Sequence, residues 1–250
     1  MQTVLITGCS SGFGLETARL FLDRGWNVVA TMRKPDDSLL PQSKHLRILT
    51  LDVTDEASIV DAVDAAGDID ALVNNAGIGW LNALEGTPMQ IVRDIFEINT
   101  FGTMAMMQAV LPSMRARGAG TIVNVTSSVT LMPLPLLSVY SASKAAINAL
   151  TGSVARELRE FGIRACVVIP GRAPETSFST NAQSLLAEKG GFPKAYENFA
   201  KGIFAHMLSA PVTQVTKSAD VSEVIWNAVT DPDAPASIPA GADAVEAFKN

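Results

Sequence analysis

The sequence predicts an α/β protein with a doubly wound, predominantly parallel sheet of about seven strands and helices on both faces. Three observations support this prediction. Short runs rich in β-branched residues alternate with segments of helical periodicity along the 250 residues. These runs are apolar throughout, as in parallel strands that are buried on both faces. No linker, charge block or internal repeat divides the chain, so we expect a single domain over residues 1–250.

Strands are predicted where a short β-branched run lies between turn residues. The first, TVLIT at 3–7, precedes a glycine-rich turn, and NVVAT at 27–31 and TIVNVT at 121–126 have the same character. The full set of predicted strands is 3–7, 27–31, 46–51, 71–74, 121–126, 164–169 and a short final strand at about 236–239. Helical spacing of apolar residues predicts helices at 13–24, 56–66, 90–98, 103–117 and about 139–161.

The stretch from residue 170 to residue 211 is less regular. It begins with a Pro-Gly-Arg-Ala-Pro turn and continues through many Ser, Thr, Asn and Gly residues. This composition is typical of a long loop with a short helix or two, and loops of that length in compact domains are usually functional. We therefore expect residues 172–210 to form a substrate-binding loop or lid.

The charge balance excludes two classes of partner. Only 18% of the residues are charged, against about 25% in a typical soluble chain, and 19 Lys and Arg stand against 25 Asp and Glu for a net charge of −6. Such a chain offers no electrostatic footprint for nucleic acid or for an anionic membrane surface. We expect neither as a partner.

Cysteine and histidine usage points to a reduced, cytoplasmic protein without a metal. Two cysteines and two histidines are too few for a disulfide framework or for metal-ligand spacing. The N-terminus has no basic region followed by a long apolar run, so no secretory signal is predicted. The charge-free stretches at 98–114 and 118–143 are predicted to be buried soluble segments, because the first is short and the second contains prolines and several polar residues.

A glycine-rich turn follows the first predicted strand. It contains Gly8, Gly12 and Gly14 in the spacing G-x-x-x-G-x-G. Glycines between a strand and a helix let backbone amides approach a pyrophosphate at the positive end of the helix dipole. The spacing differs from G-x-G-x-x-G, and a plain tight turn is the alternative interpretation.

Two short patterns also match serine hydrolases and acylases. Residues 8–12 fit G-x-S-x-G, the nucleophile elbow, and residues 141–144 fit S-x-x-K. An elbow directly after the first strand would lack the earlier strand that supplies an oxyanion loop. Neither S-D-N nor K-T-G accompanies S-x-x-K. A serine esterase is therefore the third-ranked interpretation.

A second group of residues carries proton-transfer chemistry. Tyr140 and Lys144 are four residues apart on a predicted helix, so their side chains share one face, and Ser127 ends the preceding strand. A phenol is a poor base at neutral pH, but a neighbouring ammonium favours its charged form. A serine hydroxyl beside it can hold a substrate carbonyl oxygen. Taken alone, a Tyr and a Lys at this spacing are also an ordinary pair.

Taken together, these residues resemble the short-chain dehydrogenase/reductase family in order and spacing. The resemblance covers residues 3 to about 171 and is carried by Thr7-Gly8-x-x-x-Gly12-x-Gly14, Asn74-Asn75-Ala76-Gly77, Asn99, Ser127, Tyr140-x-x-x-Lys144 and Pro170-Gly171. It implies a Rossmann-like fold and reversible hydride transfer between a nicotinamide cofactor and a carbonyl compound or secondary alcohol.

The resemblance also implies roles for individual residues. Tyr140 would be the general acid and base, Lys144 would lower its pKa and bind the nicotinamide ribose, and Ser127 would hold the substrate. Asn99, at a kink in the long helix, would hold a water that links Lys144 to solvent. The expected cofactor-binding residues are Gly8, Ser10, Ser11, Gly12, Phe13, Gly14, Arg33, Lys34, Asp52, Val53, Asn75, Ala76, Gly77, Tyr140, Lys144, Pro170 and Gly171.

Cofactor choice is predicted from the end of the second strand, where an Asp or Glu would accept from both ribose hydroxyls and repel a 2′-phosphate. The residues at 30–34 are Ala-Thr-Met-Arg-Lys, with no carboxylate until Asp36. Arg33 can bind a phosphate with two parallel hydrogen bonds, Lys34 adds charge, and Ser11 is a third candidate donor. We expect NADP(H) rather than NAD(H). The alternative is that Arg33 and Lys34 are a solvated surface pair.

One position departs from the family pattern. The family commonly has Pro-Gly-x-x-x-Thr, in which the Thr holds the nicotinamide carboxamide. Here that position is Glu175, and the nearest hydroxyls are those of Thr176 and Ser177. Either the loop is one residue longer or the backbone holds the carboxamide.

The remaining expectations concern substrate and assembly. Apolar residues at 129–139 and 78–81, with the lid, predict a pocket for a medium-sized apolar ketone or hydroxysteroid-like substrate. A catalytically silent NADP(H)-sensing protein is the alternative, although a sensor needs no proton-transfer group. The apolar and small-residue surfaces of helix 103–117 and of the helix after Tyr140 predict a homodimer or homotetramer.

Overall fold

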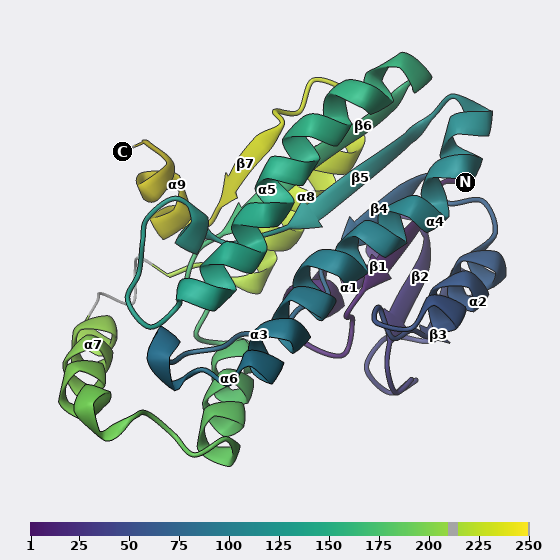
Figure 1. The fold of residues 1–250 in the computed structure, drawn as a ribbon. Coiled ribbons are helices and arrows are strands. Elements are labelled where there is room, and N and C mark those ends of the chain that lie inside the picture. Colours follow the sequence, from purple (N-terminus) through teal and green to yellow (C-terminus); the bar gives the residue numbers. More distant parts are fainter. Residues whose placement is uncertain (210–214, 250) are drawn as a thin grey trace.

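A seven-stranded sheet organises the computed structural model, which describes residues 1–209 and 215–249 (Figure 1). The strands are β1 (Thr3–Thr7), β2 (Asn27–Met32), β3 (Leu46–Thr50), β4 (Ala71–Asn74), β5 (Gly120–Val125), β6 (Ile163–Pro170) and β7 (Ser237–Ala240). Their hydrogen-bonded order is β3-β2-β1-β4-β5-β6-β7, and every neighbouring pair is parallel. The predicted fold class is confirmed.

Helices connect these strands. They are α1 (Gly12–Asp23), α2 (Glu56–Ala66), α3 (Met89–Phe96), α4 (Gly102–Arg117), α5 (Ser138–Leu158), α6 (Ser177–Glu188), α7 (Glu197–Ser209), α8 (Ser218–Thr230) and α9 (Ala242–Lys249). Local chemistry sets some of the helix boundaries. For example, α2 begins after Asp55, whose carboxylate accepts a hydrogen bond from the Ala57 amide at 3.0 Å, and α4 ends at Gly118, which has φ +66°.

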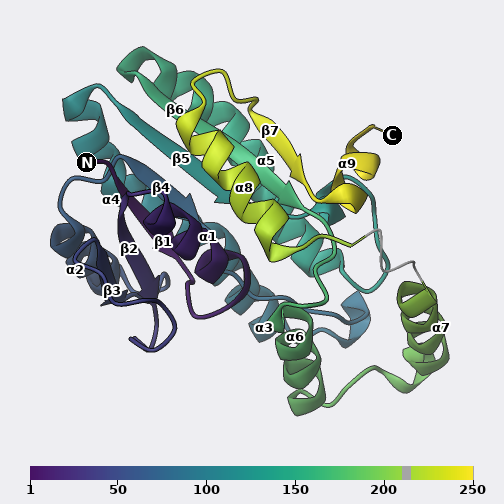
Figure 2. The same cartoon turned by 180° about the vertical axis from the view of Figure 1, so that it is seen from behind.

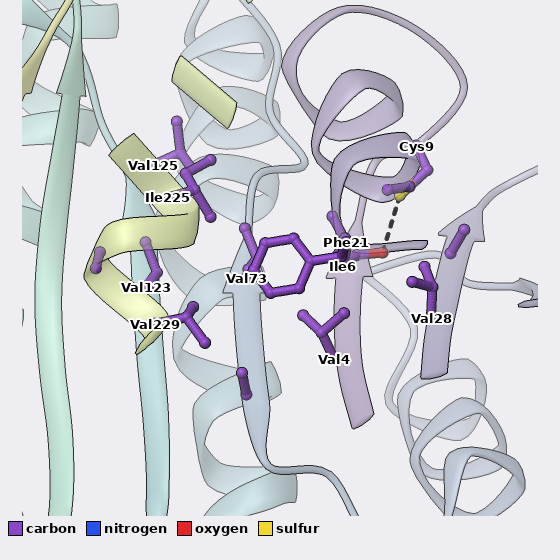
Figure 3. Close-up of a cluster of buried hydrophobic side chains, with 14 of the residues drawn as sticks. Val4, Ile6, Cys9, Phe21, Val28, Val73, Val123, Val125, Ile225 and Val229 are labelled. Atoms are coloured by element: carbon purple, nitrogen blue, oxygen red, sulfur yellow. Dashed lines mark hydrogen bonds between the residues drawn. The ribbon is translucent and has the colours of Figure 1, made fainter. Parts of the chain in front are cut away.

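Two apolar layers hold the helices on the sheet. Alternate residues of β1 point to opposite sides, so Val4 and Ile6 pack with α1 and α8 while Leu5 packs with α2, α4 and α5. Figures 1 and 2 show these two helix layers from the front and from behind. In the α1 and α8 layer, Phe21 lies over β1 and β4, and Ile225 lies next to β5 (Figure 3).

The two helices predicted at 90–98 and 103–117 are present as α3 and α4, although no loop separates them. A π-helical turn, Glu97–Phe101, joins α3 directly to α4. Gly102 at the join is buried against Val53, where a Cβ would lie 2.8 Å from the Val53 Cγ2 atom. The glycine therefore permits close packing between segments and does not end the helix.

The region after β6 is more helical than predicted. The expected loop with a short helix or two contains α6 and α7, while Ala210 and Pro211 at its end lie outside the described residues. The helices α8 and α9 were not predicted. In α8, Val221, Ile225 and Val229 recur every four residues and are buried, so this helix forms by covering the sheet.

The strand order places a crevice at one edge of the sheet. The chain runs from β1 outward to β2 and β3, then returns to β4 on the other side of β1. Connections at such a switch point leave in opposite directions and open a crevice at the carboxyl ends of the strands, where ligands bind in doubly wound folds. Along residues 1–209 and 215–249, no helix has the length and apolarity needed to cross a bilayer.

Candidate active site

A cleft of about 740 Å³ opens at this carboxyl edge. Its walls come from the segments that follow the first six strands and from α6. The predicted site residues along it are Gly8, Ser10, Ser11, Gly12, Phe13, Arg33, Asp52, Val53, Asn75, Ala76, Gly77, Ser127, Tyr140, Lys144, Pro170 and Gly171. Gly14, Lys34 and Asn99 are not among the residues that line it. Motifs spread over most of the chain therefore meet in one place.

The turn after β1 requires glycine for steric reasons. Gly8 has φ +75°, and a Cβ there would lie 2.8 Å from the Ala76 Cα atom. Gly12 has φ +57° and opens α1. Gly14 is buried, and a Cβ there would lie 2.5 Å from the Asn75 Nδ2 atom. The first two glycines shape the cleft wall, whereas Gly14 lets α1 pass close to the loop after β4.

Asn75 ties the loops after β1 and β4 together. Its side-chain amide donates to the Thr7 carbonyl oxygen at 3.0 Å and to the Gly8 carbonyl oxygen at 3.1 Å. Its backbone N–H and that of Ala76 both donate to the Thr7 hydroxyl at 3.0 Å. The two loops that flank the switch point therefore form one rigid unit.

Tyr140, Ser127 and Lys144 lie together in the cleft. The Ser127 hydroxyl hydrogen-bonds the Tyr140 side chain, and the Lys144 ammonium donates to the Val125 carbonyl oxygen at 3.0 Å. Burial raises the pKa of Tyr140 to about 12, although the hydrogen bond with Ser127 acts in the opposite direction. Burial also lowers the pKa of Lys144 to about 8.

In the protein alone the pKa of Tyr140 lies above its ordinary value, and its lowering by Lys144 stays a prediction. Both side chains are buried, and removal from water disfavours the charged form of each group. This desolvation is the largest cause of both shifts. Tyr140 is therefore a protonated phenol at neutral pH.

Asn99 lies at the predicted kink, which is the π-helical turn between α3 and α4. Its Oδ1 atom accepts from the Ile78 N–H at 2.9 Å, and its Nδ2 atom donates to the Ile78 carbonyl oxygen at 2.9 Å and to the Ser143 hydroxyl at 3.1 Å. A Cβ at Gly77 would lie 3.0 Å from Asn99 Oδ1 and 3.3 Å from Lys144 Nζ. The two polar atoms therefore flank a small space that glycine leaves open.

Basic and acidic groups stand at the β2 and β3 end of the cleft. Arg33 and Asp52 both line it, and both Arg33 and Lys34 are exposed. The pKa of Asp52 lies below its ordinary value, mainly because the Thr54 N–H donates to it, with a smaller contribution from the positive charge of Arg33. The Arg33 charge is therefore close enough to Asp52 to influence charged groups at this end of the cleft.

The structure explains the departure at Glu175. The Glu175 carboxylate accepts from the Ser218 N–H at the start of α8, at 2.6 Å, and Glu175 does not line the cleft. Thr176 does line it, and a Cβ at Gly12 would lie 3.4 Å from the Thr176 side chain. Thr176, which the sequence prediction omitted from the site, thus stands opposite the glycine-rich turn. The sequence signal for this placement was that Thr176 follows Gly171 one residue later than the Thr of the Pro-Gly-x-x-x-Thr pattern does.

The cleft also has an apolar wall. Its side chains include Trp80, Leu134, Leu137, Phe178 and Phe204, while Arg172, Asn181 and Gln183 add polar groups. The predicted stretches 78–81 and 129–139 contribute to this wall, as does the region 172–210. Phe178 and Phe204 were not singled out from the sequence because nothing local marks them as lining residues.

His45 is not placed to activate Ser10 as a nucleophile, and the side chain of the other histidine, His206, lies outside the described residues. His45 bonds to Asn27, the first residue of β2, and this places it at the opposite edge of the sheet from the turn after β1. Within residues 1–209 and 215–249, no three His, Cys, Asp or Glu side chains are grouped to hold a metal ion.

Comparison with known proteins finds one family. A family model described as short chain dehydrogenase matches residues 2–185. The uncharacterized oxidoreductase YusZ of Bacillus subtilis (strain 168) is 36% identical over 217 residues, which cover 82% of this chain and 77% of that protein. The 17-beta-hydroxysteroid dehydrogenase type 1 of Mus musculus is 36% identical over 235 residues, 88% of this chain and 67% of that protein.

Solved structures agree with this match. A short-chain dehydrogenase from Streptomyces avermitilis superimposes with a TM-score of 0.83 at 31% identity, covering 99% of this chain and 90% of that one. A short chain dehydrogenase from Burkholderia cenocepacia in complex with NADP has a TM-score of 0.77 at 26% identity, covering 100% and 93%. A 3-ketoacyl-(acyl-carrier-protein) reductase from Brucella melitensis complexed with NADH has a TM-score of 0.79 at 25% identity, covering 96% and 97%.

Proposed function

Because the chain belongs to the short-chain dehydrogenase family, we propose that it transfers a hydride reversibly between NADP(H) and a carbonyl compound or secondary alcohol. The observation that supports this most directly is that Ser127, Tyr140 and Lys144 share one cleft with the glycine-rich turn. The family assigns the class of reaction. The cofactor preference, the substrate and the roles of individual residues are our proposal.

The cleft fits a dinucleotide. The first turn of α1 presents backbone N–H groups beside Gly8 and Gly12, and among the described contacts no side chain caps this helix. Free N–H groups at a helix N-terminus favour an anionic group such as a pyrophosphate. Ser10, Ser11, Asp52 and the loop after β4 extend the same wall. When bound, the cofactor supplies the hydride.

The protein supplies the proton. Tyr140 is protonated at neutral pH, so its hydroxyl can give its proton to the carbonyl oxygen as the carbonyl carbon is reduced. Ser127 orients the tyrosine hydroxyl and is placed to hold the same oxygen. Lys144 lies in the same cleft, where its ammonium donates to the Val125 carbonyl oxygen. We propose that a water held by Asn99 in the space beside Gly77 passes a proton to Lys144, and that Lys144 passes a proton to Tyr140 after each turnover.

Replacing Tyr140 tests this assignment. The Tyr140→Phe variant keeps the ring but loses the proton, so we expect turnover of carbonyl compounds with NADPH to fall by about 10²-fold or more while cofactor affinity is retained. The measurement is the consumption of reduced cofactor against a broad panel of ketones and aldehydes. Tyr196→Phe is the matched control, because this second tyrosine bonds to Glu85 and does not line the cleft.

The same experiment separates the alternatives. A nucleotide-sensing protein would bind NADP(H) but turn over no carbonyl compound, and Tyr140→Phe would change nothing. A serine esterase would hydrolyse activated esters without any cofactor. Either result would overturn the proposed oxidoreductase activity.

Arg33 supports the proposed preference for NADP(H). One charged hydrogen bond to a phosphate is worth about 1.5–3 kcal/mol, which corresponds to roughly 10- to 100-fold in affinity. We expect Arg33→Asp to lower kcat/KM with NADPH by about this factor and to shift preference toward NADH. Lys44→Asp, an equal charge change at an exposed residue, is the control. Wild-type protein that uses NADH as well as NADPH would contradict the preference.

The substrate end of the proposal rests on the apolar wall. A medium-sized apolar ketone or hydroxysteroid-like alcohol suits Trp80, Leu134 and Phe204 better than a sugar or a charged acid does. The similar 17-beta-hydroxysteroid dehydrogenase supports the same substrate class.

We propose that the 172–210 region acts as the lid of a single domain. We also propose that the protein works in the cytoplasm, which suits its two free thiols, Cys9 and Cys166, both of which are buried.

A further inference from the structure

One aromatic ring in the cleft is held unusually close to the proposed proton donor. Phe178, the second residue of α6, has its ring centroid 5.4 Å from that of Tyr140, with the ring planes inclined at 55°. Phe178 is 37% exposed and lines the cleft. It therefore lies beside the Tyr140 ring in the cleft and is partly open to solvent.

The backbone is shaped to admit this ring. A Cβ at Gly79 would lie 2.7 Å from two ring carbons of Phe178, a distance that real atoms do not reach. Gly79 is not in the left-handed region of φ, so its conformation would accept alanine. The glycine is therefore needed for the space that it leaves to Phe178, and not for its backbone flexibility.

The rest of α6 explains why the ring stays there. Ala182 and Leu186 of the same helix are buried, and Leu186 packs with Trp80, Ile95 and Val139. The first turn of the helix, which carries Phe178, is exposed and overhangs the cleft. The ring is thus positioned by a docked helix, while its own side chain keeps room to adjust.

This position limits what can bind. Carbon atoms in contact are about 3.5–4.0 Å apart, so a group inserted between two stacked rings would need their centres about 7 Å apart. At 5.4 Å nothing fits between Tyr140 and Phe178. A substrate carbonyl that reaches Tyr140 must therefore lie beside Phe178, with one of its substituents against the ring.

We propose that Phe178 is a specificity-determining residue that selects carbonyl compounds carrying a flat, apolar substituent, aryl or conjugated, directly on the carbonyl carbon. A flat group can pack face to face on the ring with most of its atoms at contact distance, whereas a puckered saturated ring of the same size brings fewer atoms to that distance. This inference rests on the proposed carbonyl reductase activity and narrows its apolar substrates to those with a flat group on the carbonyl carbon, so a ketone within a saturated ring, as in a hydroxysteroid, should be the poorer substrate.

A matched pair of ketones tests the proposal. Acetophenone and cyclohexyl methyl ketone have the same number of carbon atoms but differ in flatness next to the carbonyl. For wild-type protein with NADPH we expect kcat/KM to favour acetophenone. Because favourable aromatic pairs are worth up to about tenfold in binding, Phe178→Ala should lower that ratio by about tenfold. Phe178→Leu, which keeps an apolar side chain but not a flat one, should lower it as well.

Gly79→Ala provides an independent test. The added methyl group displaces the Phe178 ring, so we expect Gly79→Ala to lower the acetophenone preference in the wild-type background. In the Phe178→Ala background the nearest atom besides the Phe178 ring is the Ala182 Cβ atom, at 3.3 Å, so the same substitution should change the ratio little. Phe199→Ala on α7, a 51% exposed phenylalanine outside the cleft lining, should leave the ratio unchanged.

The preference for acetophenone over cyclohexyl methyl ketone can also be measured without turnover. Calorimetry on the NADP(H)-bound protein gives the dissociation constant of each ketone, and the ratio of the two constants is compared between variants. Absence of turnover for every carbonyl compound would overturn the proposed activity, but the ratio of dissociation constants would still report on Phe178. If Phe178→Ala and Phe178→Leu bind cofactor like the wild type and keep both ratios within about twofold, Phe178 does not determine specificity. Wild-type protein that shows no preference for acetophenone overturns the proposal in the same way.

Discussion

At the scale of single residues, Lys144 is the most unusual group in the protein. It is a buried amine whose described hydrogen bond is to the Val125 carbonyl oxygen. Burial lowers its pKa from 10.5 to about 8, so the folded protein carries an unfavourable charge at neutral pH. Between pH 8 and pH 10 the folded state releases this proton while the unfolded state retains it. Stability therefore rises with pH across this window.

Replacing this lysine should remove the effect. In the cofactor-free protein we expect the contribution of Lys144 to the free energy of unfolding to increase by about 2–3 kcal/mol between pH 8 and pH 10, at 1.36 kcal/mol per pH unit. Lys144→Met should lack this increase and be more stable than the wild type at pH 7. Urea unfolding at several pH values measures both. Lys201→Met, at an exposed lysine of α7, serves as the control, and an equal pH slope in wild type and Lys144→Met would show that the amine is not desolvated.

Tyr140 limits the pH range over which stability rises. Its pKa is raised to about 12, so between pH 10 and pH 12 the unfolded chain loses a proton that the folded protein keeps. Stability falls with pH there. The two buried groups therefore act in opposite directions on either side of pH 10.

At the scale of elements, the C-terminal segment holds the turn after β6 in place. The Asp243 carboxylate, in the first turn of α9, accepts from the Arg172 N–H at 2.6 Å and lies 2.6 Å from the Thr216 hydroxyl. The same hydroxyl accepts from the Gly171 N–H at 3.1 Å. Together with the bond from Ser218 to Glu175, these contacts tie both sides of the turn to segments more than 40 residues away in sequence.

Removing the Asp243 carboxylate tests this tether. Asp243→Ala leaves the half-buried Arg172 N–H without its partner, and an unsatisfied group of this kind costs about 1–3 kcal/mol. We expect a loss of that size in the free energy of unfolding, measured by urea titration, with weaker cofactor binding because Gly171 and Arg172 line the cleft. Asp61→Ala, at an exposed carboxylate of α2, is the control. An unchanged stability in Asp243→Ala would mean that water replaces the carboxylate.

At the scale of the whole molecule, the chain exposes more surface than a typical monomer. A protein of 26.4 kDa is expected to expose about 10,600 Å², and this one exposes 12310 Å². Part of the excess is apolar or small. Phe101 at the start of α4 is 51% exposed, and Ala145, Ala149 and Ser153 form an exposed row along α5. These features support the proposed homo-oligomer.

Light scattering tests the assembly. We expect a dimeric or tetrameric mass at micromolar concentration, and a shift toward the monomer in Ala149→Arg, because the arginine would place a charge in the interface. Ala242→Arg, at an exposed position of α9, should keep the wild-type mass. A monomeric mass for the wild type would contradict the predicted assembly.

Local patterns were sufficient for the sheet and for the first helices. Each predicted strand is present within about two residues, because a β-branched run between turn residues is a local signal. The order of the motifs was sufficient to predict that Gly8, Ser127, Tyr140 and Lys144 share one cleft. Gly8 and Ser127 follow the carboxyl ends of parallel strands, and Tyr140 and Lys144 lie on the helix that comes next in the chain. The helices α8 and α9 were missed because their formation depends on the surfaces that they cover.

The sequence by itself determined the fold class, the family and the residues that meet at the cleft, because alternation and motif spacing are written along the chain. Only the tertiary structure decided the burial that raises the pKa of Tyr140, the placement of Thr176 in the cleft with Glu175 turned away from it, and the closeness of Phe178 to Tyr140. Each of these depends on burial or on contacts between segments far apart in sequence. Such contacts exist only after the chain has folded, so no local pattern records them.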